Sequence, residues 1–374
     1  MSKLQELIKE LCPDGVEFKK LEEVCEIFSG KNKQKKEQGK YPVYGSTGII
    51  AYCDNYQYDK EQLLIARVGA NAGFIHIANG KYDVSDNTLI VDVIGTCNSI
   101  YIYYVLVNSN INRYSKGGGQ PLVTASDIKK IEIPLPPLEV QNEIVRILDT
   151  FTAHTAELQA ELQARKEQYE YYRNKLLTFD ENDERVKWIK LGEIGNTCMC
   201  KRIMKHQTSD IGEVPFFKIG TFGKEADAFI SYELYDEYKN KYSFPRKGEI
   251  LISASGTIGR TVIYDGQDAY FQDSNIIWIQ NDESKVLNKY LYYYYQIIEW
   301  NVEGGTIKRL YNTNLSKTII AYPPLSEQKR IISILDKFES LVNDLSEGLP
   351  AEIAAVQEQY EYYRNKLLTF KRKS

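Results

Sequence analysis

The stretch EQYEYYRNKLLTF occurs twice in the chain, at 167–179 and again at 358–370. A second matched pair lies upstream, because PPLEVQNEIVRILDTF at 136–151 resembles PPLSEQKRIISILDKF at 323–338. The two segments follow in the same order in both copies, so the chain carries one long repeat. Two copies are too few for a solenoid, which generally needs three or more stacked units. The repeat therefore predicts an arrangement with pseudo-two-fold symmetry.

Weaker matches extend the repeat upstream of the PPL motifs. LLIARVGANAGFIHI at 63–77 resembles ILISASGTIGRTVIY at 250–264, and DNTLIV at 86–91 resembles DSNIIWI at 273–279. These short β-branched runs between glycine-rich turns predict strands in both halves.

Each half also contains a tyrosine-rich segment, at 98–109 and 288–300. Both segments predict a helix, with Asn98 and Asn288 as candidate N-caps. Tyrosines at helical spacing are more typical of a packed core face than of a base-stacking platform, so we expect these rings to be buried.

The first repeated segment has the period of a long helix. From Ile144 to Leu176 the positions of one mainly apolar stripe recur in alternating steps of four and three residues, which is a heptad pattern. No proline or glycine interrupts the run between Pro137 and Phe179. About 40 residues at 1.5 Å each predict a helix of roughly 60 Å.

The second copy follows the same pattern with one interruption. Two successive steps of four around Leu349 form a stutter, and they fall on SEGLP, which contains Gly348 and Pro350. We expect these two residues to divide the second helix into two pieces.

The two helices are predicted to pack against each other in antiparallel orientation as a coiled coil. The first helix leads the chain away from domain one, so a helix that leaves domain two can bury its apolar side by running back along the first helix. The alternative is that each helix packs only on its own domain. The predicted seam of the helix pair consists of Leu148, Phe151, Leu158, Leu162, Tyr169, Tyr172, Leu176, Leu335, Phe338, Leu345, Tyr360, Tyr363 and Leu367.

These patterns predict an α+β (mixed α/β) fold with two similar domains joined by the helix pair. The match of VEFKKLEEV at 16–24 with VKWIKLGEI at 186–194 places the second domain soon after the first helix. The predicted limits are 1–135 for domain one, 136–179 for the central helix, 180–322 for domain two and 323–371 for the distal helix.

Composition and missing motifs argue against several classes of protein. A net charge of −4 provides no overall basic field for nucleic acid, and the six cysteines show no CxxC pair. The chain has no signal-like start and no apolar run of membrane length, so we expect a cytoplasmic protein. Nucleotide-binding loops and a methyltransferase tetrad are absent, and the three histidines are scattered. We therefore expect no catalytic residue and no metal site.

Glycine-rich and cationic loops are the remaining chemistry, and they occur in both halves. Examples are KNKQKKEQGK at 31–40, ARVGANAG at 66–73 and SASGTIGR at 253–260. Glycines let backbone amides approach phosphate, while Arg, Lys and small polar side chains can contact phosphates and base edges. Taken alone, each loop is as typical of a solvated surface turn as of a DNA-binding loop. The candidate DNA-binding residues are Lys31, Lys33, Lys35, Ser46, Thr47, Arg67, Asn71, Lys116, Gln120, Lys201, Arg202, Lys218, Thr221, Ser253, Ser255, Thr257, Arg260, Lys308 and Arg309.

Taken together, the chain resembles the specificity subunits of type I restriction-modification systems, with a target recognition domain before each repeat helix. The resemblance covers nearly all of the chain, and its most specific segments are PPLEVQNEIVRILDTF, both copies of EQYEYYRNKLLTF, and VKWIKLGEIG at 186–195. The break at Gly348 and Pro350 departs from strict equality of the two helices.

The resemblance implies a non-catalytic DNA-binding subunit. Each recognition domain would read one half of a bipartite target on double-stranded DNA, and the helix pair would set the spacer and dock the modification subunits. S-adenosylmethionine for adenine-N6 methylation, and ATP with Mg on restriction subunits, would be bound by these partners and not by this chain. The near-neutral charge then suggests that the partners supply much of the positive surface.

Two further expectations complete the sequence-based picture. KLQELIKELC at 3–12 precedes VEFKK as RNKLLTF at 173–179 precedes VKWIK, so residues 1–11 should lie near the C-terminal end of the second helix. The alternative function is a coiled-coil scaffold whose two globular domains bind proteins or small ligands. Such a scaffold would show no DNA sequence preference.

Overall fold

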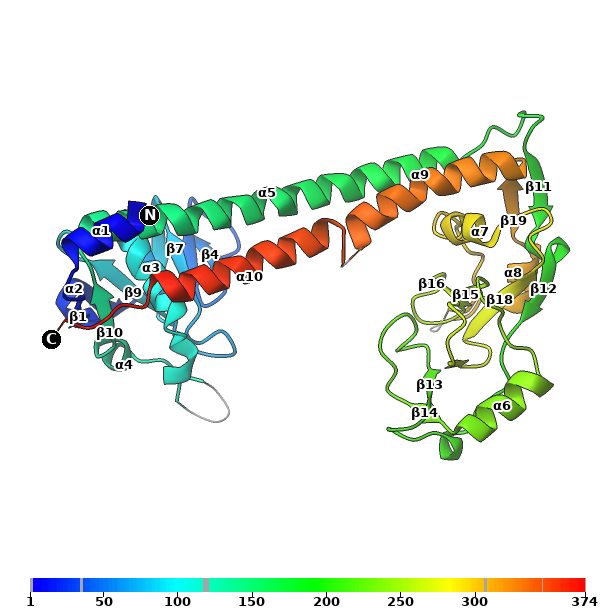
Figure 1. Ribbon diagram of the computed structural model, residues 1–374, viewed down its shortest axis with the longest axis horizontal. Helices are drawn as coiled ribbons and strands as arrows, with labels where there is room; N and C mark the ends of the chain where they lie inside the picture. The colour runs from blue at the N-terminus through cyan, green and yellow to red at the C-terminus, as the bar shows by residue number, and fades with distance from the viewer. Residues whose placement is uncertain (1–2, 34–35, 117–120, 306–307, 345, 374) are drawn as a thin grey trace. The chain divides into compact units, whose positions relative to one another are not determined.

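The computed structural model describes residues 3–33, 36–116, 121–305, 308–344 and 346–373. The chain forms two compact units, of which the first contains Met1–Gln159 together with Glu352–Ser374 and the second contains Ala160–Ala351 (Figure 1). Each unit is mixed α and β. The recognition-domain limits of 1–135 and 180–322 stay a prediction.

The central sheet of unit 1 has four antiparallel strands in the order β2-β9-β6-β7. All five residues of β6 are buried, because aliphatic side chains on both of its faces are covered by the core. The strands are β2 (Cys25–Ser29), β6 (Gln62–Ala66), β7 (Ile75–Ala78) and β9 (Thr88–Val93).

The central sheet of unit 2 repeats this order as β12-β18-β15-β16, again antiparallel. Its central strand β15 is also buried throughout. The prediction of two similar domains is thereby confirmed at the level of strand order. The strands are β12 (Gly195–Cys198), β15 (Ile250–Ser253), β16 (Thr261–Ile263) and β18 (Ile276–Asn281).

Two smaller sheets complete each unit. The outer sheets, β4-β3-β8-β5 in unit 1 and β14-β13-β17 in unit 2, both contain a parallel pair, β3 with β8 and β13 with β17. A two-stranded ladder, β1 with β10 or β11 with β19, precedes the start of each long helix. The bounds are β1 (Glu17–Lys20), β3 (Tyr41–Gly45), β4 (Gly48–Cys53), β5 (Tyr58–Asp59), β8 (Lys81–Val84), β10 (Glu132–Leu135), β11 (Lys187–Lys190), β13 (Val214–Phe217), β14 (Phe229–Ile230), β17 (Tyr270–Phe271) and β19 (Ile319–Tyr322).

The long helix α5 spans Leu138–Leu177 without a break, as the heptad pattern predicted. The distal helix is divided into α9 (Leu325–Asn343) and α10 (Leu349–Leu367). The shorter helices are α1 (Lys3–Leu11), α2 (Leu21–Val24), α3 (Ser99–Asn108), α4 (Ala125–Lys129), α6 (Tyr232–Lys241), α7 (Asn288–Tyr294) and α8 (Asn312–Lys317), with 3-10 turns η1 (Ile111–Tyr114), η2 (Leu191–Glu193) and η3 (Lys205–Gln207).

The break in the distal helix lies where the stutter placed it. Gly348 approaches the preceding turn so closely that a Cβ atom would lie 2.5 Å from the Ser340 carbonyl oxygen. Pro350 lies in the first turn of α10, where its missing N–H has no helical partner to lose. The predicted division into two pieces is confirmed.

α3 and α7 are the predicted aromatic helices, but only the first has the predicted cap. The Asn98 side chain accepts hydrogen bonds from the backbone N–H groups of Ile100 and Tyr101. Asn288 as an N-cap is wrong, because Leu287 takes that position and the Asn288 side-chain oxygen accepts from Asn281 at 2.9 Å. α7 also ends earlier than predicted, at Tyr294.

Most tyrosines of α3 and α7 are buried, as expected for packing residues, and several join their helix to the long helix of the same unit. Tyr104 in α3 donates its hydroxyl to Asp149 in α5 at 2.6 Å. In unit 2, Tyr293 donates to Asp336 and, at 2.9 Å, to Glu339, both in α9. A hydrogen bond from a tyrosine hydroxyl to a carboxylate thus joins the aromatic helix to the long helix in both repeats.

A buried glutamine in each unit makes a second set of hydrogen bonds that is repeated. The side-chain amide of Gln141 donates to the Pro136 carbonyl at 2.8 Å, and that of Gln328 donates to the Pro323 carbonyl at 2.8 Å. Each side-chain oxygen accepts from a backbone N–H at the start of the aromatic helix of its unit. The PPL motifs therefore begin a helix whose first turn is fixed to the domain.

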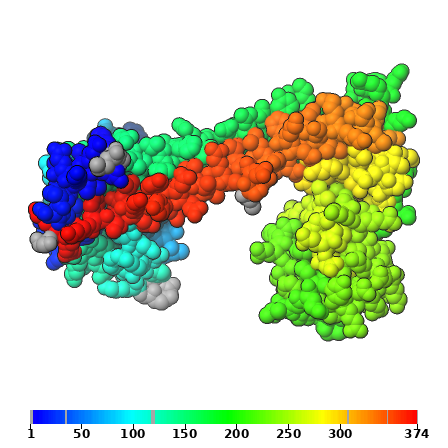
Figure 2. Space-filling model, in the orientation of Figure 1, coloured from blue at the N-terminus to red at the C-terminus, as the bar shows by residue number. Residues whose placement is uncertain are grey.

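In unit 1 the first part of α5 packs against α10 in antiparallel orientation (Figures 1 and 2). The ring of Phe151 stacks on that of Tyr363 at 5.5 Å, and Tyr360 contacts Tyr104 at 6.5 Å. Leu148, Tyr360 and Leu367 belong to the unit 1 core, and Leu158 is buried.

In unit 2 the last part of α5 packs against α9. Tyr172 stacks on Phe338 at 5.6 Å, and Tyr169 lies 6.5 Å from the same ring. Among the other predicted seam positions, Leu162, Leu176 and Leu335 pack in the unit 2 core, and Leu345 lies outside the described residues.

The N-terminal helix lies beside the end of the chain, as predicted for residues 1–11 in the part that is described. Leu4 shares the unit 1 core with Leu368. The backbone N–H of Val16 donates to the Lys371 carbonyl at 2.8 Å, and that of Lys373 donates to the Val16 carbonyl at 2.9 Å. Both chain ends therefore belong to unit 1 (Figure 1).

Candidate nucleic-acid interface

In unit 1 three loops converge on the turn at residues 85–87, between β8 and β9. Arg67, directly after β6, donates its backbone N–H to the Asn87 carbonyl at 3.0 Å. Ser46, in the β3–β4 hairpin, donates its hydroxyl to the same carbonyl at 3.1 Å. The Asn32 carbonyl, in the loop after β2, accepts from the N–H of Asp86 at 3.3 Å. We call this group of loops the first turn cluster.

An antiparallel bridge between Lys116 and Leu122 lies beside this cluster. The two residues exchange backbone hydrogen bonds at 2.9 Å. Gly69 donates to the Pro121 carbonyl at 3.1 Å, and Val123 donates to the Arg67 carbonyl at 2.8 Å. The glycine-rich loop after β6 is therefore bonded both to residues 121–123 and to the turn.

In unit 2 the loops after β12 and β15 and the segment at Arg309 converge on the turn at residues 273–275, which we call the second turn cluster. Ala254, directly after β15, donates its N–H to the Asn275 carbonyl at 2.7 Å. Ser255 donates its hydroxyl to the Asn275 side chain at 2.9 Å, and the Arg309 guanidinium donates to the Ser274 carbonyl. Arg202 pairs with Asp273 at 2.7 Å.

The two glycine-rich loops are shaped alike. Gly73 and Gly259 close them with φ of 92° and 85°, a region that favours glycine. A Cβ atom on Gly73 would lie 2.5 Å from the Asn112 backbone, and one on Gly259 would lie 2.5 Å from the Trp300 ring. Both positions therefore require glycine for conformation and for space.

Several candidate cations already have an acidic partner. Lys116 pairs with Asp127 at 2.7 Å, and Lys218 pairs with Asp227 at 2.8 Å. The hydrogen bond from Lys116, followed by that from Thr124, lowers the pKa of the Asp127 carboxyl. These lysines offer less charge to a phosphate than their number suggests.

Other candidate cations remain available at the surface. Within the described residues, Lys31, Lys33 and Lys308 are exposed and make no ion pair. Lys201 is also exposed and lies over the Tyr242 ring at 5.1 Å. Arg260, by contrast, is engaged, because its guanidinium donates to the Phe222 carbonyl at 2.9 Å.

Two candidate hydroxyls hold the loops in shape. Ser253 is buried, donates to the Thr257 carbonyl and accepts from the Arg260 N–H. The Thr221 hydroxyl accepts from the N–H of Lys218 at 3.1 Å and thereby closes its turn. These groups act on their own loops.

The remaining candidates lie at loop surfaces or outside the described residues. Thr47, Asn71 and Thr257 are exposed, while Lys35 and Gln120 fall in undescribed positions. DNA binding by the whole candidate set stays a prediction.

Asn87 and Asn275 occupy the centre of the clusters and were not among the candidates. Their signal in the sequence is the match of DNTLIV with DSNIIWI, which places an asparagine just before β9 and β18. Because both carbonyls accept from the loop after the central strand, the match reflects a shared turn as well as a shared strand.

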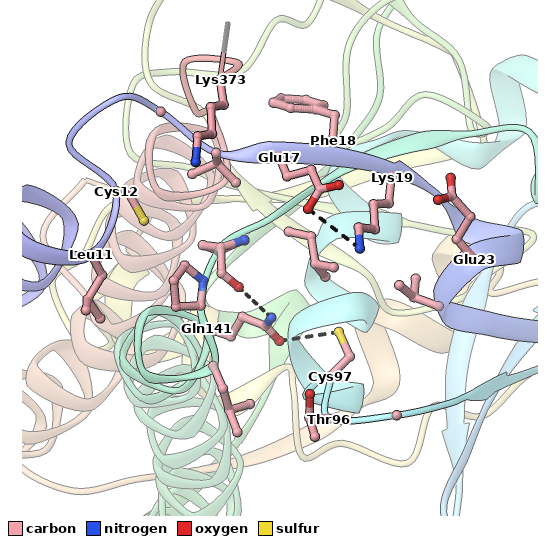
Figure 3. A pocket seen from close by; sticks show the side chains of 18 of the residues that line it. Leu11, Cys12, Glu17, Phe18, Lys19, Glu23, Thr96, Cys97, Gln141 and Lys373 are labelled. Atoms are coloured by element: carbon pink, nitrogen blue, oxygen red, sulfur yellow. Dashed lines mark hydrogen bonds and ion pairs between the residues drawn. The ribbon is translucent and has the colours of Figure 1, made fainter.

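A large hollow in unit 1 lies apart from the first turn cluster. It has a volume of about 890 Å³ and is bordered mainly by residues 11–12, 15–19, 94–97 and 135–138. Figure 3 shows Cys97 donating to the Gln141 side chain, at 3.4 Å, on its wall. Burial raises the pKa of the Cys97 thiol to about 11, so the thiolate form is disfavoured.

Among the described residues there is neither a cluster of metal ligands nor a helix of membrane-spanning character. No group of three or more His, Cys, Asp or Glu side chains there could hold a metal ion. No described helix is both long enough and apolar enough to cross a lipid bilayer.

Comparison with known proteins gives a consistent family. The model of the type I restriction modification DNA specificity domain matches residues 13–168 and again 183–355. A putative type I restriction enzyme specificity subunit from Haemophilus influenzae is 50% identical over 371 residues, covering 95% of this chain and 96% of that protein. The EcoR124I/EcoR124II specificity subunit of Escherichia coli is 33% identical over 291 residues, with 72% of this chain and 70% of that protein covered.

Solved structures show the same fold at low sequence identity. The S subunit from M. genitalium is 15% identical with a TM-score of 0.59, covering 95% of this chain and 96% of that one. A chain from work on complex assembly and conformational transition of the type I R-M system is 18% identical with a TM-score of 0.61, covering 95% and 98%. With two matched specificity domains and a relative at 50% identity, this chain belongs to the family of type I restriction-modification specificity subunits.

Proposed function

We propose that each domain reads one half of a discontinuous target on double-stranded DNA through its turn cluster. The observation that carries this proposal is the repetition of one loop arrangement, around Asn87 in unit 1 and Asn275 in unit 2, on the same strand order. Side chains in the two clusters differ, which suits two different half-sites. Within each cluster, some residues would contact phosphates and position the protein, and others would contact base edges and provide specificity.

The helix pair is proposed to set the length of DNA between the half-sites. α5 is continuous over 40 residues, so its length is about 60 Å. At about 3.4 Å per base pair this corresponds to at most roughly 18 base pairs. A target with an unread spacer of several base pairs is compatible with this length.

The chain is proposed to direct partner enzymes and to have no catalytic activity of its own. Modification subunits would bind S-adenosylmethionine and methylate adenine at N6, and restriction subunits would bind ATP with Mg. The purified chain with DNA and S-adenosylmethionine should therefore transfer no methyl group until the modification subunits are added.

The repeated tyrosines are the proposed docking residues for modification subunits. Tyr171 and Tyr362 occupy the same position of the thirteen-residue repeat and are 59% and 58% exposed. A lysine ammonium lies over each ring, at 5.6 Å for Lys175 and 5.4 Å for Lys366. Exposed aromatic rings are frequent anchors of protein interfaces, and identical anchors suit two copies of one partner.

The decisive experiment is to map methylated adenines in host DNA with and without this chain. We expect a discontinuous motif that disappears when the chain is removed. Replacing residues 16–133 with another recognition domain should then change one half of the motif only. If the chain were a scaffold, methylation would show no sequence preference. A domain replacement that altered both halves of the motif would contradict the proposal that each domain reads one half-site.

Docking can be tested separately on the assembled complex. The double variant Tyr171→Ala and Tyr362→Ala should weaken assembly with the modification subunits, measured by size-exclusion chromatography or calorimetry. Tyr232→Ala is a matched control, because this tyrosine is 51% exposed on α6, away from the repeat helices. Equal assembly by the double variant and the control would reject the docking proposal.

A further inference from the structure

Arg67 differs from the other arginines among the candidate residues. Three of the four candidate arginines are engaged by acceptors of this chain, since Arg202 pairs with Asp273, Arg260 donates to Phe222 and Arg309 donates to Ser274. The guanidinium of Arg67 makes no hydrogen bond and no ion pair with any described residue, and its Nε atom is buried without a partner.

The backbone of Arg67 is held firmly while its side chain is not. Its N–H donates to the Asn87 carbonyl at 3.0 Å, and its carbonyl accepts from Val123 at 2.8 Å. The residue is half-buried, and its backbone lies between the turn and Val123. This anchoring orients the start of the side chain, which is the preorganisation a recognition residue needs.

An unpaired guanidinium N–H shielded from water is unfavourable, because the group has lost hydration without gaining an acceptor. Such a group is satisfied when an acceptor arrives from outside the chain. The corresponding position in unit 2 is Ala254, held by the same two backbone hydrogen bonds but fully buried and without a polar side chain. The arginine is therefore not required by the turn itself.

We propose that Arg67 is a specificity-determining residue of the first recognition domain, donating to O6 and N7 of a guanine in the half-site read by that domain. Guanine offers two acceptors at the spacing of the guanidinium fork, and this pairing is the commonest specific contact of arginine in the major groove. The inference rests on the proposed DNA-reading function and adds one residue and one base to it. Ala254 cannot make this contact, so the second half-site is read by other side chains.

The test uses the full chain assembled with its modification subunits. Methylated adenines are mapped in cells that carry Arg67→Ala, Arg67→Lys or the parent chain. Both variants should relax the motif at one G·C pair of one half-site, with discrimination at that pair reduced by about 5- to 150-fold. Arg67→Lys is included because lysine keeps the charge but not the planar fork.

Arg113→Ala serves as the matched control. This arginine lies in the same domain, is exposed and donates to the neighbouring Tyr114 hydroxyl at 2.7 Å. It removes the same charge and should leave the motif unchanged. An intact second half-site in every variant shows that the complex is folded and assembled.

Two results would overturn the inference. Uniformly weaker methylation at all sites with an unchanged motif would assign Arg67 to a phosphate, and an unchanged rate and motif would assign it no contact. Both leave the proposed function standing, because the parent chain still specifies the motif. A parent chain without any motif would instead reject the function itself.

Discussion

Tyr293 in α7 and Tyr295 directly after α7 should respond differently when each is replaced by phenylalanine. Tyr293→Phe removes a hydroxyl that donates to Asp336 and Glu339 in α9. Tyr295→Phe removes a hydroxyl that is buried and has no hydrogen-bond partner among the described residues. The first variant should destabilise unit 2, and the second should leave its stability equal or higher.

The magnitude follows from the contacts of each hydroxyl. A hydrogen bond to a charged group contributes about 1.5–3 kcal/mol, and the partial exposure of Asp336, at 47%, favours the lower end. We therefore expect Tyr293→Phe to lower the free energy of unfolding by about 2 kcal/mol. Removing an unsatisfied buried hydroxyl should raise it by up to about 1 kcal/mol, after the small void left by the oxygen is taken into account.

Thermal and urea unfolding of the full chain would measure both effects. A change of 1 kcal/mol shifts Tm by about 2–4 °C in a unit of this size, so Tyr293→Phe should lower the unit 2 transition by about 4–8 °C. Tyr295→Phe is the internal control for ring packing. Equal losses in the two variants would show that the hydrogen bonds of the Tyr293 hydroxyl contribute no stability to unit 2.

Three further outcomes are expected from the structure. Gly259→Ala should destabilise unit 2 by about 1 kcal/mol or more, because φ is +85° and the Cβ would lie 2.5 Å from Trp300, whereas Gly220→Ala, with open space around it, should be nearly neutral in urea unfolding. The Arg146 hydrogen bonds lower the pKa of Glu143 from 4.5 to about 2, so this carboxylate stabilises the fold above pH 4.5 and loses its contribution as the pH falls towards 2. Glu143→Gln should therefore have a free energy of unfolding about 1 kcal/mol lower than the parent chain at pH 7. A difference in stability that persisted at pH 2 would contradict this assignment. Insertion of four residues after Leu162 should lengthen α5 by about 6 Å and widen the methylated motif by about two base pairs with both half-sites unchanged, and an altered half-site would refute the spacer role.

The helices were predictable because their determinants are local and periodic. Alternating steps of four and three with no internal proline predicted α5, and Gly348 followed by Pro350 predicted the division between α9 and α10. Helix pairing was predictable too, because a repeated apolar stripe needs a partner and the repeat supplied one.

The details of capping and of the turn clusters were not predictable in the same way. Asn98 and Asn288 have equivalent sequence settings, but Asn281 at the end of β18 binds the second asparagine and leaves Leu287 at the cap. The sequence predicts that Ser253 is a polar loop residue, but this side chain is buried and closes the loop after β15. Such outcomes depend on contacts between segments distant in sequence, which period and composition do not encode.

The division of the chain bears on the order in which the ribosome delivers its parts. Unit 2 is a contiguous segment, whereas unit 1 needs Glu352–Ser374 to complete its core and the pairing of Val16 with residues 371 and 373. During synthesis the downstream unit therefore has all of its residues first, while the upstream unit waits for the last ones. A chain truncated at residue 351 and released from the ribosome should accordingly protect unit 2 from protease while unit 1 is still cleaved.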